Sequence, residues 1–252
     1  MILPRPQVIA LILFGLWVGW LPGSSAAGEI KISPIRVDLS AAKPVGVVTV
    51  ANPSAEPILL HLRLKQWSHH DGPDAFQDSR HVLLNPMIFE LEPGAQQVVR
   101  IGLTHPLREE RESSFRLFIR EVPDSSKPKQ QNVATQLNIS LPIFVAPRDP
   151  VPPDLVWRLV RRSATELALR VQNEGNLHGE VYSISVLRSD GEPFAFVDQR
   201  SYVLPGQGRE WLLPAGSVTE EDLLTLTADT RQGRVETALR LGTPSAIEEA
   251  LR

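Results

Sequence analysis

Strict alternation over Gln131–Pro147 is the sequence feature that most constrains the fold. From Val133 onward every second residue of this stretch is apolar or β-branched: Val133, Thr135, Leu137, Ile139, Leu141, Ile143 and Val145. A period of two predicts a strand with one apolar face, about twice as long as the usual five or six residues. Pro142 lacks the N–H that a central strand donates, so we expect an edge strand there. Long apolar edges recruit other chains, and we therefore expect this strand to pair with a partner.

The first 27 residues have the pattern of a secretory signal peptide. A short start with one cation, Arg5, precedes the apolar run Val8–Trp20, and small residues follow at Ser24–Ala27. This order predicts cleavage after Ala27 and export of the mature chain. The alternative is an uncleaved anchor, although the apolar run is shorter than the roughly 20 residues of a membrane span.

Composition excludes several classes of protein. The chain contains no cysteine, which rules out disulfides and thiol chemistry. Its small net charge of −3 argues against a nucleic-acid-binding protein, which would normally carry an excess of basic residues. With 22 prolines and 16 glycines spread along the chain, many short strands are favoured over helices.

Strand and turn signals predict an all-β protein of two immunoglobulin-like β-sandwich domains. We expect an N-terminal domain at 28–147, a proline-rich linker at 148–153, a C-terminal domain at 154–243 and a tail at 244–252. Residues 69–78 are expected to form a polar loop. A short, stiff linker should hold the two domains at an angle and leave a binding cleft between them.

Catalytic and metal-binding patterns are weak. His69-His70-Asp71 and Asp74 are metal-ligand types, but no second cluster accompanies them, so we expect no metal site. The sequence has no nucleophile elbow, phosphate-binding loop or dinucleotide fingerprint. We therefore predict a protein that is not an enzyme, has no catalytic residues, and uses neither cofactor nor ATP.

Further motifs along the chain are Glu92-Pro93-Gly94, Val99-Arg100, Arg111–Phe115, Arg120–Pro123 and Phe144–Pro147, then Asn173–Asn176 and Tyr202–Gly206 with Trp211. Taken together, these motifs resemble one known family, the periplasmic chaperones of the chaperone–usher pathway that assembles fimbriae (pili). The resemblance covers essentially the whole mature chain, and the motifs occur in the family's order and spacing. Those of the second domain are similar to the family's archaic branch.

The resemblance implies a mechanism and two partners. Fimbrial subunits of this pathway lack their last strand, and the chaperone lends its own edge strand before delivering them to an outer-membrane usher in the periplasm. The residues expected to fill the subunit's groove are Val133, Thr135, Leu137, Ile139 and Leu141. The alternative is that they face the chaperone's own core, as half of any sandwich strand does.

The resemblance also implies charged sites. The family's arginine that grips the subunit's terminal carboxylate corresponds to Arg36, and its partner lysine corresponds to Pro142, a departure from the family pattern. Arg116 is our candidate for the missing cation. Arg100, Glu112 and Asp229 would form a structural ion pair with a loose third partner. The alternative for Arg36 is an ordinary solvated strand arginine.

Two other functions remain open. A secreted structural or adhesive module of tandem immunoglobulin-like domains is the main alternative, and a carbohydrate-active β-sandwich enzyme is a weaker one. The sequence does not decide whether the free protein hides its edge by self-association.

Overall fold

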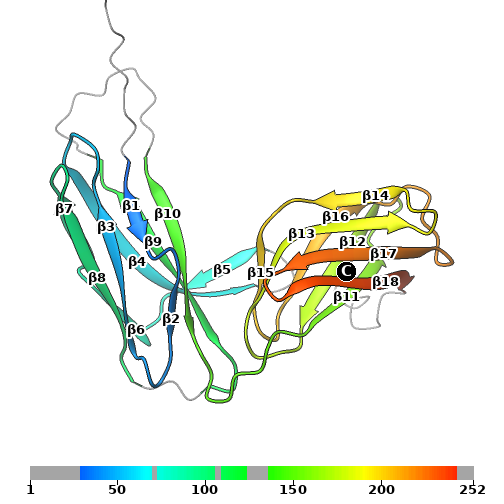
Figure 1. Cartoon of the computed structure of the whole chain (residues 1–252), viewed down its shortest axis with the longest axis horizontal. Coiled ribbons are helices and arrows are strands. Elements are labelled where there is room, and N and C mark those ends of the chain that lie inside the picture. Colours follow the sequence, from blue (N-terminus) through cyan, green and yellow to red (C-terminus); the bar gives the residue numbers. More distant parts are fainter. Residues whose placement is uncertain (1–28, 70–72, 106–108, 124–135, 243–252) are drawn as a thin grey trace, which may run out of the picture.

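A computed structural model describes residues 29–69, 73–105, 109–123 and 136–242. The described chain consists of strands β1–β18 and connecting loops (Figure 1). The predicted signal peptide, 1–27, and the tail, 244–252, lie outside these residues. Within the described ranges there is no helix long and apolar enough to cross a membrane.

The first sandwich packs two sheets face to face. One sheet has the order β1-β3-β8-β6, and the other has the order β2-β10-β9-β4-β5, with β7 paired to β4. The strands are β1 (Lys31–Ser33), β2 (Val37–Leu39), β3 (Val45–Ala51), β4 (Ile58–His69), β5 (Asp74–Gln77), β6 (Val82–Asn85), β7 (Ile88–Leu91), β8 (Gln96–Leu103), β9 (Ser113–Glu121) and β10 (Asn138–Val145).

Alternation of side chains builds the core of this sandwich. In β4, Ile58, Leu60 and Leu62 are buried while Leu59 and Arg63 are exposed, because successive strand residues point to opposite faces. The inward residues of β2, β4, β9 and β10 meet those of β3 and β8 in one apolar cluster. A cysteine-free chain therefore has a continuous hydrophobic core to hold this half together.

The N-terminal strand changes sheets at Pro34, between β1 and β2. β1 pairs antiparallel with β3 in the four-stranded sheet, whereas β2 pairs parallel with β10 in the other sheet. Arg36 lies at the start of this second segment, next to the cleft described below.

The second sandwich has its own core and a single continuous path of strands. The order is β14-β13-β17-β18-β11-β12-β16, with β15 paired to β13, and β11 and β18 form its parallel join. Its strands are β11 (Leu155–Arg161), β12 (Glu166–Asn173), β13 (Gly179–Arg188), β14 (Pro193–Val197), β15 (Ser201–Val203), β16 (Gly208–Pro214), β17 (Leu223–Thr230) and β18 (Gly233–Gly242). The apolar residues of these strands form a cluster separate from that of the first half.

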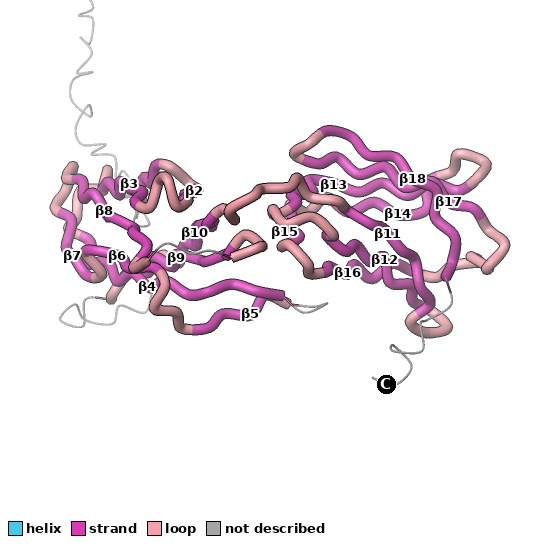
Figure 2. The backbone as a smooth tube through the Cα atoms, turned by 90° about the horizontal axis from the view of Figure 1, so that it is seen from below, coloured by secondary structure: helices cyan, strands magenta, loops and turns pink. Residues whose placement is uncertain are grey.

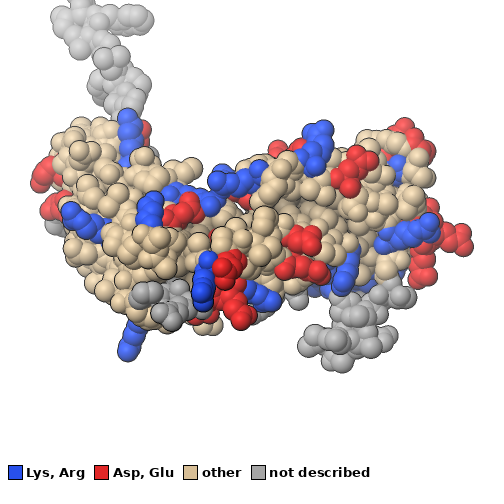
Figure 3. Space-filling model, turned by 60° about the horizontal axis from the view of Figure 1, so that its bottom comes forward, with Lys and Arg blue, Asp and Glu red and all other residues tan. Residues whose placement is uncertain are grey.

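The two sandwiches meet at an angle, as the sequence predicts (Figures 1 and 2). The β4–β5 hairpin extends beyond the first core toward β15 of the second sandwich (Figure 1). The molecular surface is hollowed between the two lobes, with basic and acidic side chains beside the hollow (Figure 3). The all-β, two-sandwich architecture with a cleft is therefore confirmed.

Candidate functional site

The edge of β10 is only partly covered. On one side β10 pairs with β9 along its whole length, from Asn138 to Val145. On the other side β2 covers only Ile143–Val145. Among the described residues no strand pairs with the remaining edge, Asn138–Pro142, so the predicted edge at Pro142 is confirmed. The backbone groups on this side can pair with an added strand.

The predicted groove-filling residues follow a gradient along this edge. Leu141 is 5% exposed and belongs to the first sandwich's own core. Ile139 is half-buried and packs against that core, and Leu137, just before β10, is also half-buried. Val133 and Thr135 lie outside the described residues. Of the described positions, Leu141 and Ile139 therefore face the first core, and Leu141, next to the cleft, is more buried than Ile139 and Leu137 farther along the edge.

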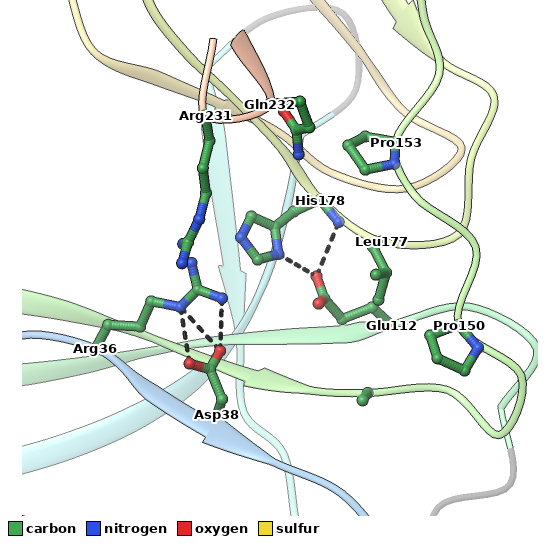
Figure 4. Close-up of a pocket in the computed structure, with 10 residues that line it drawn as sticks. Arg36, Asp38, Glu112, Pro150, Pro153, Leu177, His178, Arg231 and Gln232 are labelled. Carbon is green, nitrogen blue, oxygen red and sulfur yellow. Dashed lines mark hydrogen bonds and ion pairs between the residues drawn. The ribbon is translucent and has the colours of Figure 1, made fainter.

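A pocket of about 320 Å³ lies between the sandwiches and contains the predicted anchor Arg36. The lining comes from the ends of β2, β9 and β10 in the first sandwich, the linker and two turns of the second sandwich: Arg36, Asp38, Glu112, Ala146, Pro150, Pro153, Leu177, His178, Arg231 and Gln232 (Figure 4). Arg36 is bound through Nε to the Asp38 carboxylate, at 2.8 and 3.1 Å. Its guanidinium also lies 5.0 Å from the centre of the Phe144 ring. The structure therefore places Arg36 in the cleft, where the resemblance expects it.

Arg116, the candidate second cation, does not line this pocket. It is opposite Pro142 in the register of β9 and β10, but its guanidinium stacks on Trp67 at 3.9 Å and on Tyr202 at 5.3 Å. Burial among these rings lowers the pKa of Arg116 from its ordinary value, although the Asp74 carboxylate opposes this. The residue contributes a cation–π contact to the junction of the two sandwiches.

The predicted ion pair of Arg100, Glu112 and Asp229 is wrong. Glu112 Oε1 instead accepts hydrogen bonds from the backbone N–H of His178 at 3.2 Å and interacts with its Nδ1 at 2.7 Å. Asp229 pairs with Arg234 on the neighbouring strand. Arg100 is exposed on β8, in the four-stranded sheet. Glu112 does join the two sandwiches, but its partner is a histidine.

The motif Asn173–Asn176 is the centre of the junction, a role that sequence reasoning missed. The buried Asn173 side chain donates to the carbonyls of Leu177 and Val203. Asn176 donates to the carbonyls of Glu110 and Asp149 and accepts from the N–H of Val151. This asparagine thereby joins the first sandwich, the linker and the second sandwich. Two asparagines around a glycine at a strand end were the available signal.

His69 and Asp74 are also part of the junction, and the expected polar loop at 69–78 is wrong where it is described: His69 ends β4 and Asp74–Gln77 form β5. The N–H of Leu204 donates to His69 Nε2, and the N–H of His69 donates to the Gln207 side chain. Asp74 pairs with Arg209 of β16. No group of three or more ligand-type side chains within the described residues could hold a metal ion. These polar residues serve the contact between the halves.

Aromatic side chains fill the space between these polar contacts. Phe144 of β10 stacks on His178, with ring centres 3.7 Å apart and an interplanar angle of 9°. Trp67 and Tyr202 meet edge to face at 5.5 Å. Trp67, Phe144 and Leu204 form a buried cluster that includes residues of both sandwiches. The orientation of β10 is therefore linked to the second sandwich through Phe144.

One family model matches the chain, over residues 29–150: pili and flagellar-assembly chaperone, PapD N-terminal domain. This range contains β1–β10 and half of the residues that line the pocket. No curated protein matches the chain.

Solved structures of similar architecture support the fold at low sequence identity. The chaperone–tip subunit complex CsuC–CsuE, from the archaic chaperone–usher Csu pili of Acinetobacter baumannii, matches with a TM-score of 0.67 and 15% identity, covering 86% of this chain and 100% of that chain. The Salmonella enterica SafA pilin complex with the SafB chaperone matches with a TM-score of 0.57 and 20% identity, covering 85% of this chain and 97% of that chain. The CupB2 chaperone of Pseudomonas aeruginosa matches with a TM-score of 0.54 and 22% identity, covering 84% of this chain and 100% of that chain.

Proposed function

Because residues 29–150 match the family model of pili and flagellar-assembly chaperones, PapD N-terminal domain, we propose that this chain binds fimbrial subunits by lending them the edge of β10. The observation that carries the proposal is the uncovered edge Asn138–Pro142, which ends where β2 begins to pair. A subunit strand added here would continue the six-stranded sheet through main-chain hydrogen bonds. Such a ladder tolerates different subunit sequences.

The orientation of Ile139 and Leu141 toward the core agrees with this role. A strand added beside β10 would continue the inner face of the sheet and cover the half-buried Leu137 and Ile139. Each fully buried aliphatic side chain contributes about 1.5–3 kcal/mol. Leu141 would remain mainly part of the first sandwich's own core, so the outer positions should carry most of the binding.

The proposal extends to location and delivery. The signal peptide predicted at 1–27 and the family together support a periplasmic protein, with domains at 28–147 and 154–243 joined by the linker at 148–153. We propose delivery of the bound subunit to an outer-membrane usher, and release when a better-fitting strand replaces β10. Similarity to the Csu chaperone complex supports the archaic branch. No step of this account requires catalysis or ATP.

Arg36 is proposed to bind the terminal carboxylate of the subunit. Its guanidinium is held in the cleft by Asp38 and Phe144, and a planar guanidinium suits a carboxylate. The site lies beside the cleft end of β10, so a subunit strand that runs along the edge could end at this pocket.

Co-expression with a fimbrial subunit encoded in the neighbouring genes tests the proposal. A chaperone should give a soluble one-to-one complex on size exclusion, and the subunit alone should aggregate or be degraded. A secreted adhesive module, the alternative function, would remain uncomplexed and would not rescue the subunit. The latter result would overturn the proposal.

A further inference from the structure

Two arginines, one from each sandwich, point toward each other in the cleft pocket. Arg36 immediately precedes β2, and Arg231 lies in the turn between β17 and β18. Both line the pocket, and their guanidinium groups converge (Figure 4). Two cations that face each other repel, and an anion placed between them removes that repulsion.

Asp38 holds Arg36 in the orientation that leaves one side of its guanidinium for a ligand. The Asp38 carboxylate engages Nε and Nη2 of Arg36. The third nitrogen, Nη1, is buried and has no hydrogen-bond partner among the described residues. A buried N–H without an acceptor is costly, so the Nη1 side of Arg36 is prepared for an incoming acceptor.

Arg231 is only partly neutralised by its own sandwich. Its nearest carboxylate oxygen, Oε2 of the buried Glu180, is 3.6 Å away. The other oxygen of Glu180 is bound by Nε and Nη2 of Arg200. One carboxylate therefore serves two arginines, and Arg231, with a side chain 51% exposed, keeps donors for a further partner.

We propose that a carboxylate binds between Arg36 and Arg231, so that the second sandwich supplies the cation that Pro142 cannot. The inference rests on the proposed function in one respect: the carboxylate is taken to be the terminus of a captured subunit. Arg116, by contrast, is occupied by stacking on Trp67 and Tyr202. Capture of the carboxylate would thus contact both sandwiches at once.

N-acetylglycine is a suitable probe because it presents a terminal carboxylate, and N-acetylglycinamide is its neutral control. We expect N-acetylglycine to cause saturable shifts of the Arg36 side-chain Nε–Hε signal in NMR spectra of the full-length mature chain, at constant ionic strength. The amide should cause none. Linear shifts without saturation, or equal shifts with both compounds, would overturn the site.

Arg231→Gln should weaken N-acetylglycine binding at least tenfold. Arg234→Gln is the matched control, because Arg234 lies on the same hairpin but pairs with Asp229 and is outside the pocket; it should bind as the wild type does. Unchanged binding by Arg231→Gln, with an unchanged backbone spectrum, would refute the role of Arg231.

Subunit capture, measured separately by co-purification, keeps this test distinct from that of the proposed function. Saturable N-acetylglycine binding that depends on Arg231 supports the carboxylate site even if no fimbrial subunit is captured. Capture of a subunit without such binding would uphold the chaperone function and reject the site.

Discussion

Single residues at the junction determine how closely the two sandwiches approach each other. A Cβ atom on Gly175 would lie 2.2 Å from the carbonyl oxygen of Pro152 in the linker. Only glycine permits that approach without movement of the backbone. The neighbouring Asn176 then reaches across to the first sandwich. The packing of the linker therefore depends on the glycine between two asparagines.

Gly175→Ala should destabilise the protein by about 1–3 kcal/mol, the usual cost of overpacking. Urea unfolding followed by tryptophan fluorescence measures this change. Gly102→Ala is the control, since its added Cβ would meet Val45 at an ordinary 3.6 Å. Equal stability of the two variants would show that the linker contact is not tight.

Leu137→Asp should abolish subunit capture and change the unfolding free energy by less than about 1 kcal/mol, because Leu137 is only half-buried beside the open edge. Leu141→Asp should instead unfold the first sandwich, since it places a charge in the core. Capture assays and thermal melts on both variants distinguish the roles. A Leu137→Asp protein that captures subunits normally would remove Leu137 from the binding edge.

Sequence reasoning located some of these residues and missed others for a physical reason. Arg36 could be placed in the cleft because the resemblance supplies its position. The contact of Glu112 with His178 could not be predicted, because it joins residues 66 positions apart on different sandwiches. Pairs of this kind depend on the orientation of whole domains, which local periodicity does not specify.

At the scale of elements, β10 is the strand whose pairing is incomplete. Alternation and Pro142 were sufficient to predict an edge strand, and the pairing of β2 with only Ile143–Val145 confirms it. The β4–β5 hairpin was harder to predict. Its end at His69 and Asp74 is polar because it contacts polar groups of the second sandwich, and polar residues normally indicate a loop.

Hydrogen exchange can test the open edge of β10 directly. Amides of Asn138–Leu141 that point away from β9 should exchange rapidly in the free chain and slow at least tenfold when a subunit is bound, because new ladder hydrogen bonds protect them. Strand β5 ends the same sheet on the opposite side and serves as the control. Protection that appears at β5 and not at β10 would mean that the subunit docks elsewhere.

At the scale of the whole molecule, the two sandwiches are joined by more than the linker. The Phe144–His178 stack, the Glu112–His178 contact and the His69–Leu204 hydrogen bond all cross the junction. The sequence predicted the presence of two sandwiches and a cleft, but not these contacts. They hold the cleft pocket and the β10 edge in one arrangement.

His69→Ala should loosen that arrangement. The substitution leaves the Leu204 N–H without its acceptor, at a cost of about 1–3 kcal/mol. We expect a larger radius of gyration by small-angle X-ray scattering, with both sandwiches still folded. His81→Ala, at an exposed position, is the control, and an unchanged radius for His69→Ala would argue against a role for this contact in fixing the angle.

Disulfide trapping tests the central claim, that β10 lends its edge to a subunit, most directly. The chain contains no cysteine. In the variant Ser140→Cys, any disulfide between chaperone and subunit must therefore involve position 140, on the open edge. Residues paired across adjacent strands have Cβ atoms about 4.5–5.5 Å apart. Single cysteines are then introduced in turn along the terminal strands of the subunit. One subunit position, and the positions two residues on either side of it, should form a disulfide with the Ser140→Cys chaperone. None should form a disulfide with the control chaperone Ala75→Cys. A stable complex that shows no crosslink to position 140 at any point of the scan would contradict the account.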